Sequence, residues 1–246
     1  MSSRLAILLC GAFVSGCVST QRQERAASRA ELGAAYLREQ NPANAVVILE
    51  EAVKLDSRNA QAWEHLGLAY MAQGAPEESE RALQRAVRLA PDTAEIRNTY
   101  GILLMSEGRY TDAIAQFEQA LKDRTYDSPA MVMSNLGFAL HRDDQNALAL
   151  SYLTEAIDRA PNLCQAWFNR GLVYTALRDD EMALSDFESA LGLCDADGAY
   201  LQAGELRLKK GDPIGGCQYL KVVAQRAPHS AAGRSARSRI AQACHR

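Results

Sequence analysis

Small and apolar residues recur along the chain with a period of about 34 residues, which is the period of a two-helix repeat. Glycine marks the period at Gly33, Gly67, Gly101, Gly137, Gly171 and Gly204. After the first five of these glycines, Ala or Ser follows at offset twelve, Leu or Phe at sixteen and Ala at nineteen. The apolar offsets fall on one face of a helix, so each repeat predicts a pair of antiparallel helices.

The residue type in each slot has a physical reason. Glycine or alanine stands where two helices cross closely, and Leu, Tyr or Phe fills the space between them. Pro91 and Pro161 end the second helix of their repeats, because proline lacks the backbone donor. The pattern resembles tetratricopeptide repeats. That resemblance implies an all-α fold, a right-handed superhelical solenoid of about six repeats with a C-terminal capping helix.

The repeat boundaries follow from the same alignment. We expect an array over residues 26–230, with repeats at 26–59, 60–93, 94–127, 130–163, 164–197 and 197–230. The last is degenerate but keeps Gly204, Gly211, Leu220 and Pro228. Residues 231–246 are rich in Arg and Ser, which predicts the polar capping helix that a solenoid end requires.

The N-terminus reads as a targeting segment. Arg4 is followed by an apolar stretch at 5–14 that is too short to span a bilayer as a stable helix. The sequence VSGC at 14–17 resembles the lipobox of bacterial lipoproteins, which predicts a signal peptide at 1–16 and a lipidated tether at 17–25. Cys17 would carry diacylglycerol and an N-acyl chain, an anchor that is firm when two or more chains insert. The alternative is a cleaved secretory signal with an accidental Cys.

Sorting and compartment follow from this segment. Val18 stands where the inner-membrane retention signal has Asp, so the resemblance implies the periplasmic face of the outer membrane. That compartment is oxidising, and four cysteines lie in the repeats: Cys164, Cys194, Cys217 and Cys244. On antiparallel helices the first two fall at one end of a hairpin, and the last two at another. We expect the bridges Cys164–Cys194 and Cys217–Cys244. Buried free thiols are the competing interpretation.

Composition narrows the classes of function. The net charge of −3 argues against a nucleic-acid binder, which needs a basic face. The chain has four histidines, none of them in an HExxH arrangement, and it carries no phosphate loop, GxSxG or GxGxxG. We therefore expect no catalysis, no metal, no small-molecule substrate and no cofactor other than the acyl group on Cys17.

The concave face predicts a binding surface. In this repeat class the first helix of each repeat lines that face, through positions 2, 5, 9 and 12. These slots are mainly apolar here, which suits an amphipathic helix or an extended apolar segment of a partner. The expected groove residues are Leu37, Leu68, Met71, Ile102, Met105 and Phe138. The alternative is that the superhelix, the tether or the cap covers them.

A more specific resemblance lies in the middle of the chain. Residues 97–104 read RNTYGILL, 107–110 read EGRY, 126–129 read YDSP, and 135–137 read NLG. This block resembles the type IV pilus lipoproteins called PilF or PilW, including the Tgl-type pilotins. Many members carry two cysteines, thought to pair, where this chain has Met105 and Ala139. Both are replaced together, and the cysteines at 164–244 would take over the stabilising role.

The resemblance implies a pilotin. Such a lipoprotein binds the secretin subunit of the type IV pilus machine and promotes its insertion and multimer assembly in the outer membrane. The groove would shield an amphipathic secretin segment, and the acyl anchor would supply contact with membrane lipid. Two other functions stay open: a scaffold of another envelope machine, such as a tight-adherence apparatus or barrel-insertion complex, and an activator of a peptidoglycan enzyme.

Overall fold

The chain folds into helices connected by short turns. The computed structural model describes the backbone of residues 3–244 and the side chains of residues 20–244, and this part of the chain contains no strand. Cys17, the predicted lipidation site, lies outside the residues whose side chains are described. The helices are α1 Ser3–Arg38, α2 Pro42–Leu55, α3 Ala60–Gln73, α4 Pro76–Leu89, α5 Ala94–Ser106, α6 Tyr110–Ala120, α7 Pro129–Arg142, α8 Asn146–Arg159, α9 Cys164–Ala176, α10 Asp180–Leu193, α11 Asp197–Lys209, α12 Pro213–Arg226 and α13 Ala231–Ala243.

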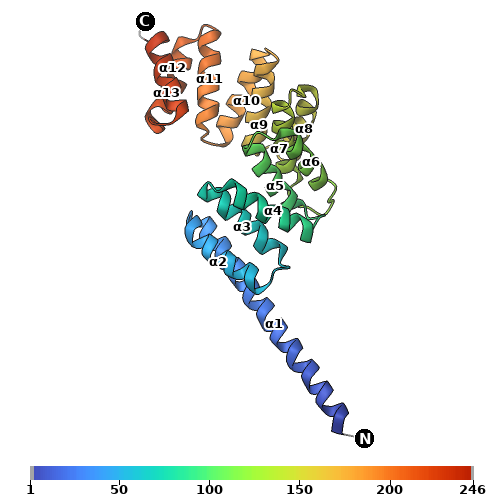
Figure 1. Ribbon diagram of the computed structural model, residues 1–246. Helices are drawn as coiled ribbons and strands as arrows, with labels where there is room; N and C mark the ends of the chain where they lie inside the picture. The colour runs from blue at the N-terminus through green and yellow to red at the C-terminus, as the bar shows by residue number, and fades with distance from the viewer. Residues whose placement is uncertain (1–2, 245–246) are drawn as a thin grey trace. The chain divides into compact units, whose positions relative to one another are not determined.

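Consecutive helices pack as antiparallel hairpins, α1 with α2 and so on to α11 with α12, and α13 packs on α12 (Figure 1). We call the first helix of each pair its A helix and the second its B helix. The A helices α3, α5, α9 and α11 begin at the starts predicted for their repeats, and α7 begins one residue earlier. The predicted all-α fold of repeated helix pairs is therefore confirmed.

Local capping sets where many helices begin. The side chains of Asn41 and Asn59 accept hydrogen bonds from the backbone N–H groups of Asn44 and Ala62, at the starts of α2 and α3. Asp179, Asp212 and Ser230 cap α10, α12 and α13 in the same way. Proline occupies the first turn of α2, α4, α7 and α12, where its missing N–H has no helical partner to lose.

The turn inside each pair uses one backbone conformation throughout. A residue with positive φ recurs at the same place in all six pairs: Gln40, Gly74, Gly108, Asp144, Arg178 and Gly211. This left-handed conformation ends the A helix, and a side chain destabilises it, so glycine is preferred. Three of the six turns have glycine and three do not.

The periodic glycines allow each A helix to cross its B helix closely. A Cβ built on Gly67 would lie 2.5 Å from Cγ of Leu83, and one on Gly101 would lie 2.5 Å from Cε1 of Phe117. Gly33, Gly137, Gly171 and Gly204 face Leu49, Leu153, Phe187 and Leu220 in the same way. All six partners are fully buried, so the period read in the sequence is the period of these helix crossings.

The chain divides into two compact units, residues 1–126 and 127–246. The boundary lies just before the two extra residues, Ser128 and Pro129, that separate the third and fourth repeats. Unit 1 contains α1 to α6, and unit 2 contains α7 to α13. Each has its own core of small and branched apolar side chains, such as Leu49, Leu66 and Leu83 in unit 1.

The predicted tether is helical. Helix α1 continues beyond the end of α2 towards the N-terminus, so residues 17–25 belong to it (Figure 1). Arg22 donates a hydrogen bond to the carbonyl of Lys54 at 3.1 Å, and Ala26 is fully buried. The packed part of α1 therefore begins near Arg22. Within the described residues, no helix is both long enough and apolar enough to cross a membrane.

Two disulfides lie in unit 2. Cys164 at the start of α9 is joined to Cys194 at the end of α10, with a Cα–Cα distance of 6.0 Å. Cys217 on α12 is joined to Cys244 at the end of α13, at 5.9 Å. These are the two pairs that the antiparallel geometry predicted. They connect elements of the fifth and sixth repeats and the capping helix.

Candidate interaction surfaces

The residues predicted to form a groove all lie on A helices. Leu37 is on α1, Leu68 and Met71 on α3, and Ile102 and Met105 on α5, all in unit 1. Phe138 is on α7 in unit 2, with the guanidinium of Arg142 5.9 Å from its ring centre. All six side chains are half-buried. They retain exposed apolar surface without belonging to the fully buried core.

One slot of the predicted groove is buried. Position 5 of a repeat was expected to be exposed, but in the first four repeats Ala30, Glu64, Asn98 and Ser134 are 4, 3, 7 and 1 % exposed, whereas Phe168 of the fifth repeat is half-buried. The reason is that neighbouring A helices pack through this position. Thr99 of α5 donates to Glu64 of α3 at 2.7 Å, and Asn169 of α9 donates to Ser134 of α7 at 3.3 Å. Position 5 therefore stabilises the stacking of A helices.

Glu64 is a buried carboxyl at this slot. Burial raises its pKa from 4.5 to about 7; the hydrogen bond from Thr99 opposes that rise, and the charge of Glu95 adds to it. The neighbouring His65 is also partly buried, which lowers its pKa. This part of the A-helix face in unit 1 is thus more polar than the sequence pattern indicated.

A small cavity of about 390 Å³ opens between the A helices α1 and α3. It is lined by small side chains, including Ala30 and Ala34, and by polar side chains, including Arg38, Gln61 and His65. The six predicted groove residues lie elsewhere on the A helices. This cavity and the six predicted groove residues therefore involve different side chains.

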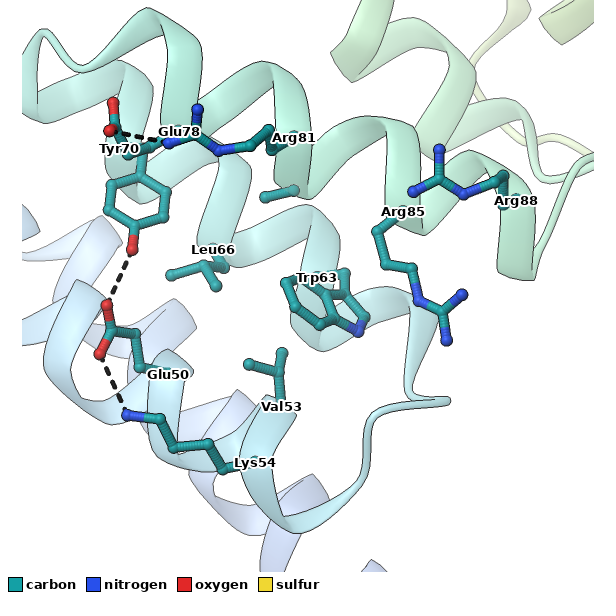
Figure 2. Close-up of a pocket in the computed structure, with 11 residues that line it drawn as sticks. Glu50, Val53, Lys54, Trp63, Leu66, Tyr70, Glu78, Arg81, Arg85 and Arg88 are labelled. Atoms are coloured by element: carbon teal, nitrogen blue, oxygen red, sulfur yellow. Dashed lines mark hydrogen bonds and ion pairs between the residues drawn. The ribbon is translucent and has the colours of Figure 1, made fainter.

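A second and larger cleft, of about 740 Å³, opens between the B helices α2 and α4. We call it the α2–α4 cleft. Trp63, Leu66 and Tyr70 of α3 form its floor, with Val53 of α2 at one side (Figure 2). Ala82 of α4 also lines the cleft. Val53, Leu66 and Ala82 are buried, and the two aromatic rings are half-buried. The bottom of the cleft is therefore apolar and partly aromatic.

Hydrogen bonds fix the polar groups of this floor. The hydroxyl of Tyr70 donates to Glu50 at 2.8 Å, and Lys54 donates to the other oxygen of that carboxylate at 3.3 Å (Figure 2). The bond from Tyr70 lowers the pKa of Glu50, while burial and Glu50 raise the pKa of Tyr70 to about 12. The indole N–H of Trp63 donates to the carbonyl of Ser57 at 3.1 Å.

The rim of the cleft is basic. Arg81, Arg85 and Arg88 follow one face of α4 at helical spacing (Figure 2). Arg81 pairs with Glu78 at 2.9 Å, and Arg85 donates to the carbonyl of Ser57 at 3.3 Å. The carboxylates of Glu50 and Glu78 are therefore engaged with Tyr70, Lys54 and Arg81, whereas Arg85 and Arg88 have no acidic partner among the contacts described.

Sequence reasoning missed this cleft, although the signal was present. At the offsets from the periodic glycine that give Arg81, Arg85 and Arg88, the third repeat has Ala115, Gln119 and Lys122, and the fourth has Ser151, Glu155 and Asp158. The repeat scaffold therefore does not require arginine there. Among the described residues, no group of three or more His, Cys, Asp or Glu side chains is arranged to bind a metal ion.

Comparison with known protein families identifies the class. Three models described as tetratricopeptide repeat match residues 36–101, 92–162 and 165–197, which together cover most of the array. With the glycine crossings and the stacked helix pairs, these matches show that the chain is a tetratricopeptide repeat protein. No curated protein sequence matches the chain.

Among solved structures, the chain is similar to two type IV pilus proteins. PilF of Pseudomonas aeruginosa has a TM-score of 0.75 and 21% identity, over 89% of this chain and 99% of that one. PilW, described as a widely conserved type IV pilus biogenesis factor, has a TM-score of 0.77 and 22% identity, over 85% of this chain and 97% of that one. The complex Cut9–Hcn1 has a TM-score of 0.78 and 17% identity, over 93% of this chain and 45% of that one. At these identities the likeness concerns the fold.

Proposed function

We propose that this protein is an outer-membrane lipoprotein that acts as a pilotin: it binds the secretin of a type IV pilus machine and promotes its membrane insertion and multimer assembly. The observation that carries the proposal is the combined likeness to PilF and PilW. The fold matches nearly the full length of both proteins, and the block at 97–137 resembles their family in sequence.

The apolar strip on the A helices supports a protein partner. Leu68, Met71, Ile102 and Met105 keep accessible apolar surface on neighbouring helices that pack together. An amphipathic segment of the secretin can bury its apolar face against them, and methionine adapts its shape to such a segment. The partner would be a protein segment, without nucleic acid or a small-molecule substrate.

Attachment to the membrane would come from the N-terminal segment. The lipobox-like sequence at 14–17 supports acylation of Cys17, and α1 would then connect the acyl chains directly to the first helix pair. Because α1 includes residues 17–25, a helical segment would join the anchor to unit 1 and hold it near the inner leaflet of the outer membrane.

Groove variants test the proposal directly. Leu68→Glu and Met71→Glu each place a carboxylate on the half-buried strip. We expect each variant to capture at least about tenfold less secretin than the wild type, as measured by pull-down. Leu148→Glu is the matched control, because Leu148 is 52 % exposed on the B helix α8. Helicity should be unchanged in all three. Normal capture by both strip variants would reject the groove as the secretin site.

A further inference from the structure

We propose that the α2–α4 cleft is a second docking site, for an acidic amphipathic segment of a protein partner whose apolar side chain enters the cleft between flanking carboxylates. This site lies on B helices, apart from the apolar strip on the A helices, and the inference does not depend on the identity of the pilus partner.

Comparison with the equivalent place in unit 2 shows why the cleft is open. Counting from the periodic glycine, Leu66 and Ala82 correspond to Arg170 and Asp186. In unit 2 these two form a bidentate ion pair, with distances of 2.8 and 2.9 Å. The guanidinium of Arg170 lies 5.0 Å from the ring centre of Trp167 and 5.8 Å from that of Tyr174.

Unit 1 keeps the two aromatic residues of this arrangement but not the ion pair. Trp63 and Tyr70 correspond to Trp167 and Tyr174, and Trp63 Nε1 donates to a loop carbonyl as Trp167 Nε1 does. Leu66 and Ala82 bring no charged group to the floor of the cleft, and the cleft is open. An apolar side chain from outside can occupy that space without leaving a buried charge unpaired.

The positive charge of the rim favours a partner segment with negative charge. Arg81, Arg85 and Arg88 span about 10 Å along α4, since a helix rises about 1.5 Å per residue. Lys54 stands on the opposite side of the cleft. Carboxylates on either side of the inserted apolar group reach these cations, and guanidinium binds carboxylate in bidentate fashion. A flat phospholipid surface satisfies the rim but does not fill an apolar floor between two helices.

The test uses the purified full-length protein and fluorescent synthetic peptides of about 14 residues. In the probe peptide, Leu recurs at helical spacing and Glu fills the neighbouring positions; the reversed peptide has Lys in place of Glu. We expect the probe to bind and to change the fluorescence of Trp63 in a Trp167→Phe background. The affinity should fall as salt increases, because the rim contacts are ionic.

Charge reversal tests the site. Arg85→Glu with Arg88→Glu should weaken the probe at least about tenfold and strengthen the reversed peptide, an exchange that loss of folding cannot produce. Lys122→Glu with Lys221→Glu makes the same change in net charge at two other exposed positions, in the turn after α6 and on α12, and should leave both affinities unchanged. Leu68→Glu, which tests the A-helix strip, should also leave them unchanged.

Other results overturn the proposal. One is that the probe fails to bind. Another is that it binds the Arg85→Glu, Arg88→Glu variant as tightly as the Lys122→Glu, Lys221→Glu variant. A third is that vesicles of phosphatidylcholine with one part in four phosphatidylglycerol bind through Arg85 and Arg88 while the peptide does not. The third result would assign the rim to anionic lipid.

Discussion

At the scale of single residues, the periodic glycines set how closely the helices of a pair approach. Gly101→Ala should lower the free energy of unfolding by about 1–3 kcal/mol, because its Cβ would meet the buried ring of Phe117. Gly192→Ala is the matched control: Gly192 is helical and exposed with open space around it, so alanine should be neutral or stabilise by up to about 1 kcal/mol. Urea unfolding of both variants measures the difference. Equal effects would contradict the role given to the crossing.

Glu64 makes stability depend on pH. The unfolded chain ionises this carboxyl near pH 4.5, whereas the folded chain keeps the proton until about pH 7. Raising the pH through this window therefore favours unfolding, by about 3 kcal/mol in total from this residue. Glu64→Gln should remove that loss, so the variant should exceed the wild type in stability at pH 8 and differ less at pH 4. An identical pH profile in urea unfolding would show that Glu64 ionises freely in the folded state.

At the scale of elements, much of the repeat could be predicted, since it is specified by local sequence. Gly67 and Leu83 define a crossing sixteen residues apart, and Asn59 caps the helix that follows it. The groove was harder to predict because it depends on how neighbouring pairs stack. Position 5 was expected to be open, yet Glu64 and Ser134 are buried where A helices contact one another. The α2–α4 cleft differs from the fifth pair at single positions, with Leu66 and Ala82 in place of Arg170 and Asp186, and an average over repeats hides such differences.

A buried ion pair joins α9 to α10 in the fifth pair. The side chain of Asp186 is 2% exposed and that of Arg170 is 12% exposed, and Arg170 also donates to Thr154 at 3.2 Å. Hydrogen bonding to Asp186 raises the pKa of Arg170. Asp186→Asn should cost about 3 kcal/mol, because it leaves a buried guanidinium without its counter-charge. The double change to Arg170→Met and Asp186→Leu should recover most of that loss. Thermal unfolding of both proteins tests this, and a small cost for the single change would contradict it.

At the scale of the whole molecule, the two disulfides reinforce unit 2, and unit 1 has no disulfide among its described residues. Replacing Cys164 and Cys194 by serine opens a loop with a sequence separation of 30, which should lower the free energy of unfolding by about 3–4 kcal/mol. The change of Cys217 and Cys244 to serine opens a loop of 27 and should have a similar effect. Urea unfolding without reductant measures both. If dithiothreitol leaves the wild type as stable as before, the bridges do not contribute as described.

The central proposal is that this protein promotes assembly of a secretin. The measurement that tests it most directly is a blot for heat-resistant secretin multimers in membranes from cells with and without this protein. We predict that the multimers vanish in its absence while the secretin monomer persists, and that re-expression of the wild type restores them. Unchanged multimers in cells that lack the protein would contradict the pilotin proposal and favour a scaffold role with another partner.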